Sequence, residues 1–146
     1  MWNRSTIAFA VATSLVAASS AFAADISGVW STQDGASRVR LAPCGKAICG
    51  TIISLKEPND PATGKPKLDK YNQDASKRGR PVVGIELVTG MKPNSAQDRW
   101  DGSLYNPKDG NTYKGSLIAR DPLTLKLQGC VMGGLVCRSE TWTRTQ

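Results

Sequence analysis

The segment 98–118 constrains the fold of this chain more than any other, because it predicts one complete β-hairpin. Its centre is the run Asn106-Pro-Lys-Asp-Gly110, in which proline presets a negative φ and glycine accepts the positive φ that closes a tight loop. In both arms, large side chains alternate with a glycine on one face: Trp100, Gly102 and Leu104, then Tyr113, Gly115 and Leu117. Glycines within strands allow bending and close backbone approach. The hairpin therefore suits the wall of a small barrel.

Further short strands are expected along most of the chain, at 26–30, 37–41, 47–55, 82–88, 123–128 and 137–144. Those at 37–41, 82–88 and 123–128 alternate with a period of two residues, and 47–55 is more apolar throughout. The residues expected on inward faces include Val39, Leu41, Val83, Ile85, Leu87, Leu123, Leu125 and Leu127. About eight short strands with few helical signals predict an all-β domain, either an up-and-down antiparallel barrel or a sandwich. A barrel has the advantage of leaving no strand edge exposed. Without internal repeats, residues 24–146 are expected to form a single domain.

The segment 56–81 interrupts this pattern, since it is rich in proline, glycine and charges of both signs. A short helix is expected within 69–77. A loop of this length in a compact domain is either functional or mobile. It is therefore either a solvated crossover or a flap over a cavity mouth. As a flap, it would offer four side chains to an anionic ligand: Tyr71, Lys77, Arg78 and Arg80.

Residues 1–23 have the three parts of a secretory signal peptide: a positive charge at Arg4, an apolar run over 7–16 and the cleavage signal Ala21-Phe-Ala23. The apolar run is shorter than a bilayer-spanning helix requires. We therefore expect cleavage near Ala23 and a mature chain in the periplasm or secreted, without a transmembrane span. The alternative is an uncleaved membrane anchor.

The formal net charge is +7 and falls to +6 without Arg4, because residues 1–23 contain no acid. Such a balance favours anionic surfaces. The lysines and arginines are nevertheless scattered, with no run of five or more. Together with export, this distribution argues against nucleic acid as a partner.

All four cysteines follow the expected cleavage site. An even number of cysteines in an exported chain predicts disulfides. Cys44 and Cys49 suit the end of one hairpin, and a Gly-Gly turn would place Cys130 opposite Cys137. Long-range pairing and a four-cysteine metal site are the alternatives. Neither pair has the two-residue separation common in zinc modules, so no metal is expected.

The chain contains no histidine, which excludes Ser-His-Asp and Cys-His catalysis and histidine-bound metals. Asp98, Asp101 and Asp109 are close enough in sequence to suggest paired carboxylates for glycoside hydrolysis. However, Asp109 belongs to turn chemistry, and Asp98 and Asp101 fall on opposite faces of a regular strand. A carboxylate-dependent hydrolase is therefore the weaker alternative, and we expect neither catalysis nor a cofactor.

Several short motifs follow one another along residues 24–146: Gly28-Val-Trp30, Cys49-Gly-Thr-Ile52, Arg80-Pro81, Trp100-Asp-Gly102, Tyr105-Asn-Pro107, Asp109-Gly110, Tyr113, Leu127-Gln-Gly-Cys130 and Trp142-Thr-Arg144. In their order and spacing, they resemble the DUF2147 family, an exported bacterial domain of unknown function. The resemblance implies a calycin-like, lipocalin-type barrel. It also implies that an arginine of the last strand covers Trp30 at the barrel floor, where Arg144 fits and Arg138 competes.

The last expected strand leaves one question open, because four of its residues fall on one face: Arg138, Glu140, Trp142 and Arg144. Either this face points outward and exposes Trp142, or it points inward and one end of the barrel is polar.

The expected function is binding of a small hydrophobic or amphipathic molecule without catalysis. An eight-stranded barrel can be filled by its own side chains or can hold one small ligand. The candidate cavity residues are Trp100, Leu104, Tyr105, Tyr113, Leu117, Val83, Ile85 and Leu125. The two tyrosines would orient a polar head at the mouth. The alternative is an envelope protein-interaction module that acts through the loop 56–81 and the cationic surface.

Overall fold

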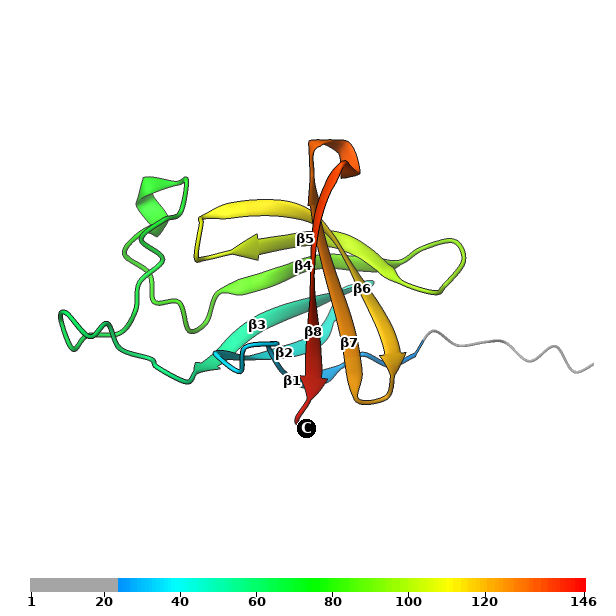
Figure 1. Cartoon of the computed structure of the whole chain (residues 1–146), viewed down its shortest axis with the longest axis horizontal. Coiled ribbons are helices and arrows are strands. Elements are labelled where there is room, and N and C mark those ends of the chain that lie inside the picture. Colours follow the sequence, from blue (N-terminus) through cyan, green and yellow to red (C-terminus); the bar gives the residue numbers. More distant parts are fainter. Residues whose placement is uncertain (1–23) are drawn as a thin grey trace, which may run out of the picture.

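The computed structural model describes residues 24–146, so the predicted signal peptide, 1–23, lies outside the described residues. Eight antiparallel strands close into one barrel, in which each strand pairs with the next and the last pairs with the first (Figure 1). The elements are β1 (Gly28–Ser31), β2 (Ser37–Cys44), β3 (Ala47–Leu55), η1 (Ala75–Lys77), β4 (Glu86–Pro93), β5 (Trp100–Asn106), β6 (Asn111–Asp121), β7 (Thr124–Val131), η2 (Met132–Gly134) and β8 (Val136–Arg144). The expected up-and-down barrel is thus confirmed, and the sandwich is not formed.

The core of the barrel follows directly from the two-residue period of its strands. In the central hairpin, Trp100 pairs with Leu117 and Leu104 pairs with Tyr113 across β5 and β6. Both leucines and the tryptophan are buried. The other buried apolar residues come from every remaining strand and from the segments that flank β1 and β4: Ile26, Val29, Trp30, Val39, Leu41, Ile52, Ile85, Leu87, Val88, Met91, Leu125, Leu127 and Trp142. The middle of the barrel is therefore filled by side chains.

One end of the barrel is closed by Trp30 and Arg144. The guanidinium carbon of Arg144 lies 4.3 Å from the centre of the Trp30 ring. The same guanidinium donates hydrogen bonds to three backbone carbonyls, those of Asp25, Ser27 and Pro122. Of the two arginines expected to compete for this position, the structure places Arg144 there. A cation–π contact of this kind contributes about 0.5–2 kcal/mol.

Two predicted strand boundaries are wrong. The strand expected at 82–88 begins only at Glu86 and continues to Pro93. Val83 is 41% exposed in the preceding turn, where the Gly84 backbone has a φ of +100°. Leu123, expected on an inward face, is 61% exposed, because the Leu123 amide donates to the Asp121 carboxylate and this bond holds the residue in the β6–β7 turn. Alternation of apolar residues does not distinguish the last residue of a strand from the first of a turn.

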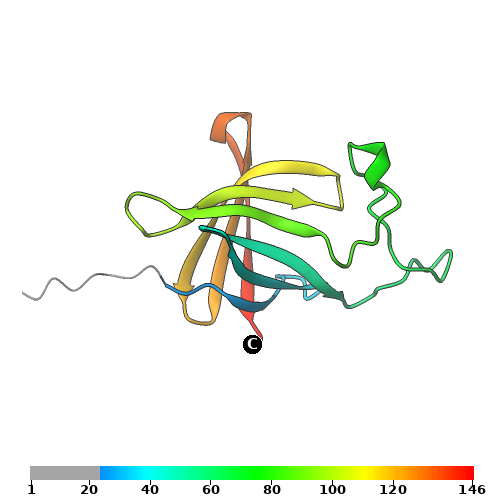
Figure 2. The same cartoon turned by 180° about the vertical axis from the view of Figure 1, so that it is seen from behind.

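The loop between β3 and β4, residues 56–85, extends away from the barrel and returns beside the tips of β5 and β6 (Figure 2). The helix expected within 69–77 is reduced to the single 3-10 turn η1, which Asp74 caps through the Ser76 amide. Within residues 24–146, no helix has the length and apolar character needed to cross a bilayer.

Candidate functional site

The end of the barrel opposite Trp30 and Arg144 is surrounded by four connections. They are residues 32–36, 56–85, 107–110 and 132–135. Because successive connections of an up-and-down barrel alternate between its two ends, these four lie around the same opening. We call this opening the mouth.

The inward face of β8 runs from a charged group at the mouth to an apolar group in the core. Trp142 pairs with Leu125, and only 2% of its surface is exposed, so this face points into the barrel. Closer to the mouth, Glu140 and Arg138 occupy the same face and are exposed. The question that the sequence left open is thus settled: the face points inward, and the mouth is its polar end.

The Glu140 carboxylate is held in place by the core beneath it, since the Trp142 indole N–H donates to Glu140 Oε2 at 3.0 Å. The mouth therefore presents a fixed acid directly above a buried aromatic ring.

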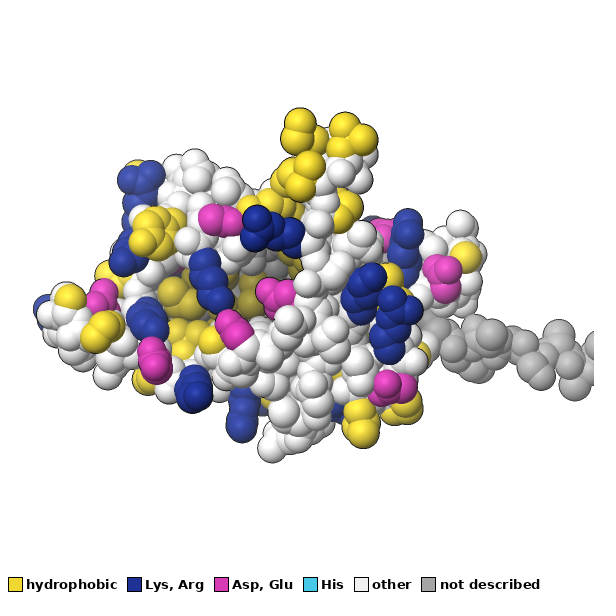
Figure 3. All heavy atoms as spheres, in the orientation of Figure 1, with side chains coloured by type: hydrophobic (Ala, Val, Ile, Leu, Met, Phe, Trp, Pro, Cys, Tyr) yellow, Lys and Arg dark blue, Asp and Glu magenta, His cyan; other side chains and the backbone are white. Residues whose placement is uncertain are grey.

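The barrel wall next to these charged residues lacks side chains. Gly115 and Gly129 pair with each other, and Gly129 pairs with Arg138 on its other side. A Cβ at Gly129 would meet Tyr113 Cβ at 3.5 Å and Leu104 Cδ1 at 3.8 Å, which is ordinary van der Waals contact, so the Tyr113 and Leu104 side chains lie beside this glycine. Figure 3 shows a hollow in this face of the molecule, with apolar atoms in its floor and side chains of both charges around it.

Two polar contacts complete the rim of the mouth. The Tyr113 hydroxyl donates to Asp109 Oδ2 at 2.6 Å, and this hydrogen bond, followed by desolvation, raises the pKa of Tyr113. Lys108 Nζ lies 3.1 Å from Asp34 Oδ2 and so joins two connections that are 74 residues apart. The Ala36 amide and then the Thr32 hydroxyl lower the pKa of Asp34 to about 2.

The structure separates the eight predicted cavity residues into three groups. Five are part of the packed core: Ile85, Trp100, Leu104, Leu117 and Leu125. Tyr113 is half-buried at the mouth, whereas Val83 lies in an exposed turn outside the core. The Tyr105 side chain lies on the outer face of β5, where its hydroxyl donates a hydrogen bond to Asp69 of the long loop. Five of the eight candidates are therefore packed core side chains.

Asp69 anchors the long loop to the outer face of β5. Its carboxylate is fully buried and accepts hydrogen bonds from Arg80 at 2.9 Å, Asn72 at 2.8 Å and the Tyr105 hydroxyl at 2.5 Å. Burial, and then the bond to Asp69, raises the pKa of Tyr105. Sequence reasoning missed Asp69, because nothing in its neighbourhood predicts that an aspartate in a charged loop is buried.

The cations that were expected to form a ligand-binding flap are engaged within the loop itself. Arg80 is paired with Asp69, Lys77 Nζ lies 3.8 Å from Asp74, and Arg78 Nε donates to the Asn72 carbonyl. A polar cleft of about 490 Å³ lies between η1 and the outer faces of β4, β5 and β6. Tyr71 is 53% exposed. The loop thus has the contacts of a docked structural segment.

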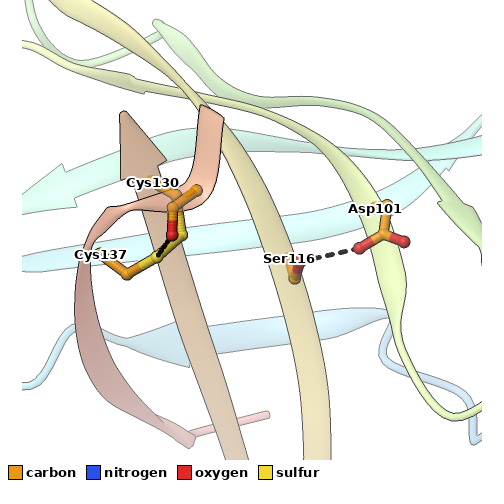
Figure 4. The surroundings of a disulfide bond; sticks show 5 residues. Asp101, Ser116, Cys130 and Cys137 are labelled. Carbon is orange, nitrogen blue, oxygen red and sulfur yellow. Dashed lines mark hydrogen bonds between the residues drawn. A yellow bond between two sulfur atoms is a disulfide. The ribbon is translucent and has the colours of Figure 1, made fainter. Parts of the chain in front are cut away.

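The three aspartates considered for hydrolysis do not converge. Asp98 accepts from Asn94 in the β4–β5 turn, and Asp101 accepts from Ser116 on the outer face of β5 (Figure 4). Asp109 lies at the mouth, at the opposite end of the barrel. This arrangement gives no support to a pair of catalytic carboxylates.

The predicted disulfides are both formed. Cys44 is bonded to Cys49 beside the β2–β3 turn, and Cys130 is bonded to Cys137 at the base of the β7–β8 turn. Within the described residues no cysteine is free, so the alternative of a four-cysteine metal site is wrong.

Comparison with known proteins agrees with this architecture. No curated protein matches the chain. Among solved structures, protein HP1028 from the human pathogen Helicobacter pylori, described as belonging to the lipocalin family, superimposes with a TM-score of 0.68 at 22% identity, over 84% of each chain. At this identity the likeness shows a lipocalin-like fold and nothing more. A family model described as "Uncharacterized protein conserved in bacteria (DUF2147)" matches residues 28–144. The chain therefore belongs to the DUF2147 family.

Proposed function

We propose that this protein binds a small hydrophobic or amphipathic molecule at the mouth of its barrel, without catalysis. The observation that carries the proposal is the inward face of β8. On this face, exposed Arg138 and Glu140 stand directly above buried Trp142, and the position paired with Arg138 on the neighbouring strand β7 is Gly129. Ligand sites in proteins typically combine apolar walls with a few placed polar groups, and the mouth has both.

The geometry favours a ligand that is apolar at one end. Its apolar part would lie over Leu127 and Trp142, the buried residues next to Glu140 on β7 and β8, and beside Leu104, whose side chain lies against Gly115. Its polar part would meet Arg138, Glu140 or the Tyr113 hydroxyl. Because the middle of the barrel is packed, the ligand would occupy only the mouth and part of it would stay in contact with water.

We further propose that the protein works outside the cytoplasm, in the periplasm or as a secreted protein. The two disulfides support this location, because disulfides persist in oxidising compartments and are rare in the cytosol. The signal peptide predicted for residues 1–23 supports it from the sequence.

The proposal is tested by a substitution that adds a large side chain to the inward face of the barrel at the mouth. Gly129→Leu should add a large side chain to the inward face of the mouth, beside Tyr113 and Leu104, and it should do so without backbone strain because Gly129 is not among the residues with positive φ. Binding is measured by the fluorescence of cis-parinaric acid, and by native mass spectrometry with lipid extraction of protein exported by its host. We expect the wild type to bind and Gly129→Leu to lose at least about tenfold in affinity, which corresponds to ~1.4 kcal/mol.

Gln128→Leu is the matched control, because it adds the same side chain to the neighbouring position, on the outer face of β7. It should bind the probe as the wild type does. The proposal is wrong if Gly129→Leu binds as tightly as the control. It is also wrong if the wild type binds none of a fatty acid, a neutral and a cationic amphiphile and carries no extractable molecule from its host.

A further inference from the structure

The turn between β7 and β8 carries a cluster of exposed apolar side chains, residues 131–136, which we call the apolar tip. Leu135 is 84% and Met132 72% exposed, and Val136 and Val131 beside them are 50% and 38% exposed. A single exposed leucine is ordinary on a protein surface, but a contiguous apolar patch marks an interaction site. Figures 1 and 2 show this hairpin projecting beyond the other strands, and Figure 3 shows apolar atoms gathered on it.

The backbone of the apolar tip holds these side chains away from the barrel. Met132, Gly133 and Gly134 all have positive φ, at 55°, 67° and 95°. Glycine adopts this conformation freely, whereas a residue with a Cβ such as Met132 does not. Directly below, the Cys130–Cys137 disulfide joins the two strands (Figure 4). The disulfide thus holds the two strands together directly below the tip, and the apolar side chains above it are exposed.

The surroundings of the apolar tip are cationic on both faces of the hairpin. Lys114 lies beside Cys130 on the outer face, and Arg138 is the first inward-facing residue of β8 below the tip. Both are exposed, and neither forms an ion pair with another residue of 24–146. The sequence from 122 to 139 contains no acid, and the first acid that follows is Glu140, the next inward-facing residue of β8 after Arg138.

We propose that the apolar tip inserts into the surface of a phospholipid bilayer that contains anionic headgroups. A projecting tip needs no complementary groove when its partner is a fluid layer of acyl chains. Insertion by a few ångströms brings Lys114 and Arg138 to the depth of the phosphates, where basic residues are attracted to anionic lipid. Because the tip belongs to the connections around the mouth, the opening would then lie close to the membrane surface.

The test is co-sedimentation of the mature protein with sucrose-loaded vesicles, made of phosphatidylcholine alone or mixed with phosphatidylglycerol. We expect binding to the mixed vesicles that weakens as salt is added. Met132→Ser with Leu135→Ser should lower the partition coefficient by about tenfold for each large side chain removed. Lys114→Gln should weaken binding to the mixed vesicles and leave binding to the neutral ones unchanged.

Leu123→Ser is the control, because it removes a leucine that is 61% exposed in the β6–β7 turn, at the other end of the barrel. It should sediment as the wild type does. The proposal is overturned if the Met132 and Leu135 double variant still binds like the wild type, or if Leu123→Ser loses as much. It is also overturned if the tip instead mediates a concentration-dependent dimer in solution and the wild type binds no vesicles.

The outcome is separable from that of the proposed function. The Met132 and Leu135 double variant should keep its affinity for soluble cis-parinaric acid, and Gly129→Leu should keep its affinity for vesicles. As a direct readout of insertion, the emission of a tryptophan at the tip, introduced as Leu135→Trp, should be quenched by brominated lipid in mixed vesicles. Absence of quenching in vesicle-bound protein would contradict insertion of the tip.

Discussion

Replacing Asp69 by asparagine should release the long loop from the outer face of β5 and leave the barrel folded. The Asp69 carboxylate is fully buried, and each of its oxygens is used: Oδ2 accepts from Arg80 and Asn72, and Oδ1 accepts from Tyr105. An asparagine keeps an acceptor for Arg80 only by turning its NH₂ group toward the Tyr105 hydroxyl, which then loses its acceptor. In either orientation the negative charge opposite Arg80 is gone.

The size of the effect follows from the exposure of the partners. Removal of one member of a fully buried ion pair costs about 3–5 kcal/mol. The Arg80 side chain is 40% exposed and can be rehydrated, so the cost is smaller. The loss of one or two hydrogen bonds to a charged acceptor gives about 2–3 kcal/mol. This energy equals a rise of roughly thirtyfold to a hundredfold in the population of the detached loop.

Limited proteolysis with trypsin measures this population, because cleavage follows the equilibrium opening of a segment when reclosing is fast. The loop carries several lysines and arginines as cleavage sites. We expect Asp69→Asn to be cut within residues 56–85 about thirtyfold faster than the wild type or more. The free energy of unfolding in urea, followed by tryptophan fluorescence, should fall by no more than the free energy with which the loop docks. Once the loop is detached, the mutation has no further effect on the stability of the barrel.

The control is Glu57→Gln in the same loop, where the carboxylate is 82% exposed and lies 3.8 Å from Lys67. Exposed pairs of this kind contribute less than about 1 kcal/mol, so its cleavage rate should stay close to that of the wild type. The reasoning is refuted if Asp69→Asn is cleaved no faster than Glu57→Gln.

Three further predictions concern the barrel and its turns. Arg144→Gln should lower the free energy of unfolding in urea by about 2–4 kcal/mol, because it removes the contact with Trp30 and hydrogen bonds to three carbonyls. A smaller decrease than that caused by Arg138→Gln would contradict this prediction. Gly110→Ala should lower the free energy of unfolding by at least about 2 kcal/mol, because its Cβ would lie 1.7 Å from the Tyr71 carbonyl oxygen. Gly64→Ala has open space around its Cβ, so it should lower the same free energy by only about 1 kcal/mol, because of its positive φ. Asp34 has a pKa lowered from 3.8 to about 2, so its contribution to the stability of the folded protein is present above pH 3.8 and is lost as the pH falls toward 2. When the free energy of unfolding is measured as the pH is lowered, Asp34→Asn should lack this loss, which is below about 1 kcal/mol because the side chain is 52% exposed. The same loss of stability in Asp34→Asn and in the wild type between pH 3.8 and 2 would contradict this prediction.

Where regular strands run through the core, the face of each residue was predictable from the sequence. Trp100, Leu104 and Leu117 are buried on one face as expected, because a strand turns alternate side chains to opposite sides. The pairing of Cys130 with Cys137 was also predictable, because a short turn brings residues at such spacing opposite each other. These are local consequences of strand geometry.

Strand ends were less predictable. Val83 and Leu123 continue an apolar alternation, yet both are exposed in turns. A turn is stabilised by hydrogen bonds to its own backbone, such as the bond from the Leu123 amide to the Asp121 carboxylate. The alternation of apolar and polar residues does not predict these bonds. Tyr105 was expected to orient a polar head at the mouth, but its hydroxyl is bound by Asp69, which lies 36 residues away in the sequence, and the pattern along one strand does not predict such a contact.

The barrel, its disulfides and the inward residues within its strands were predictable from the sequence, because they depend on neighbours along one strand or across one hairpin. Three other properties emerge only when the whole chain is folded: which charged residues meet at the mouth, the burial of Asp69 and the filling of the middle of the barrel. The tertiary structure also decided that residues 131–136 remain exposed. Each of these properties depends on how far the closed barrel and the docked loop cover a side chain, and that coverage comes from segments distant in sequence.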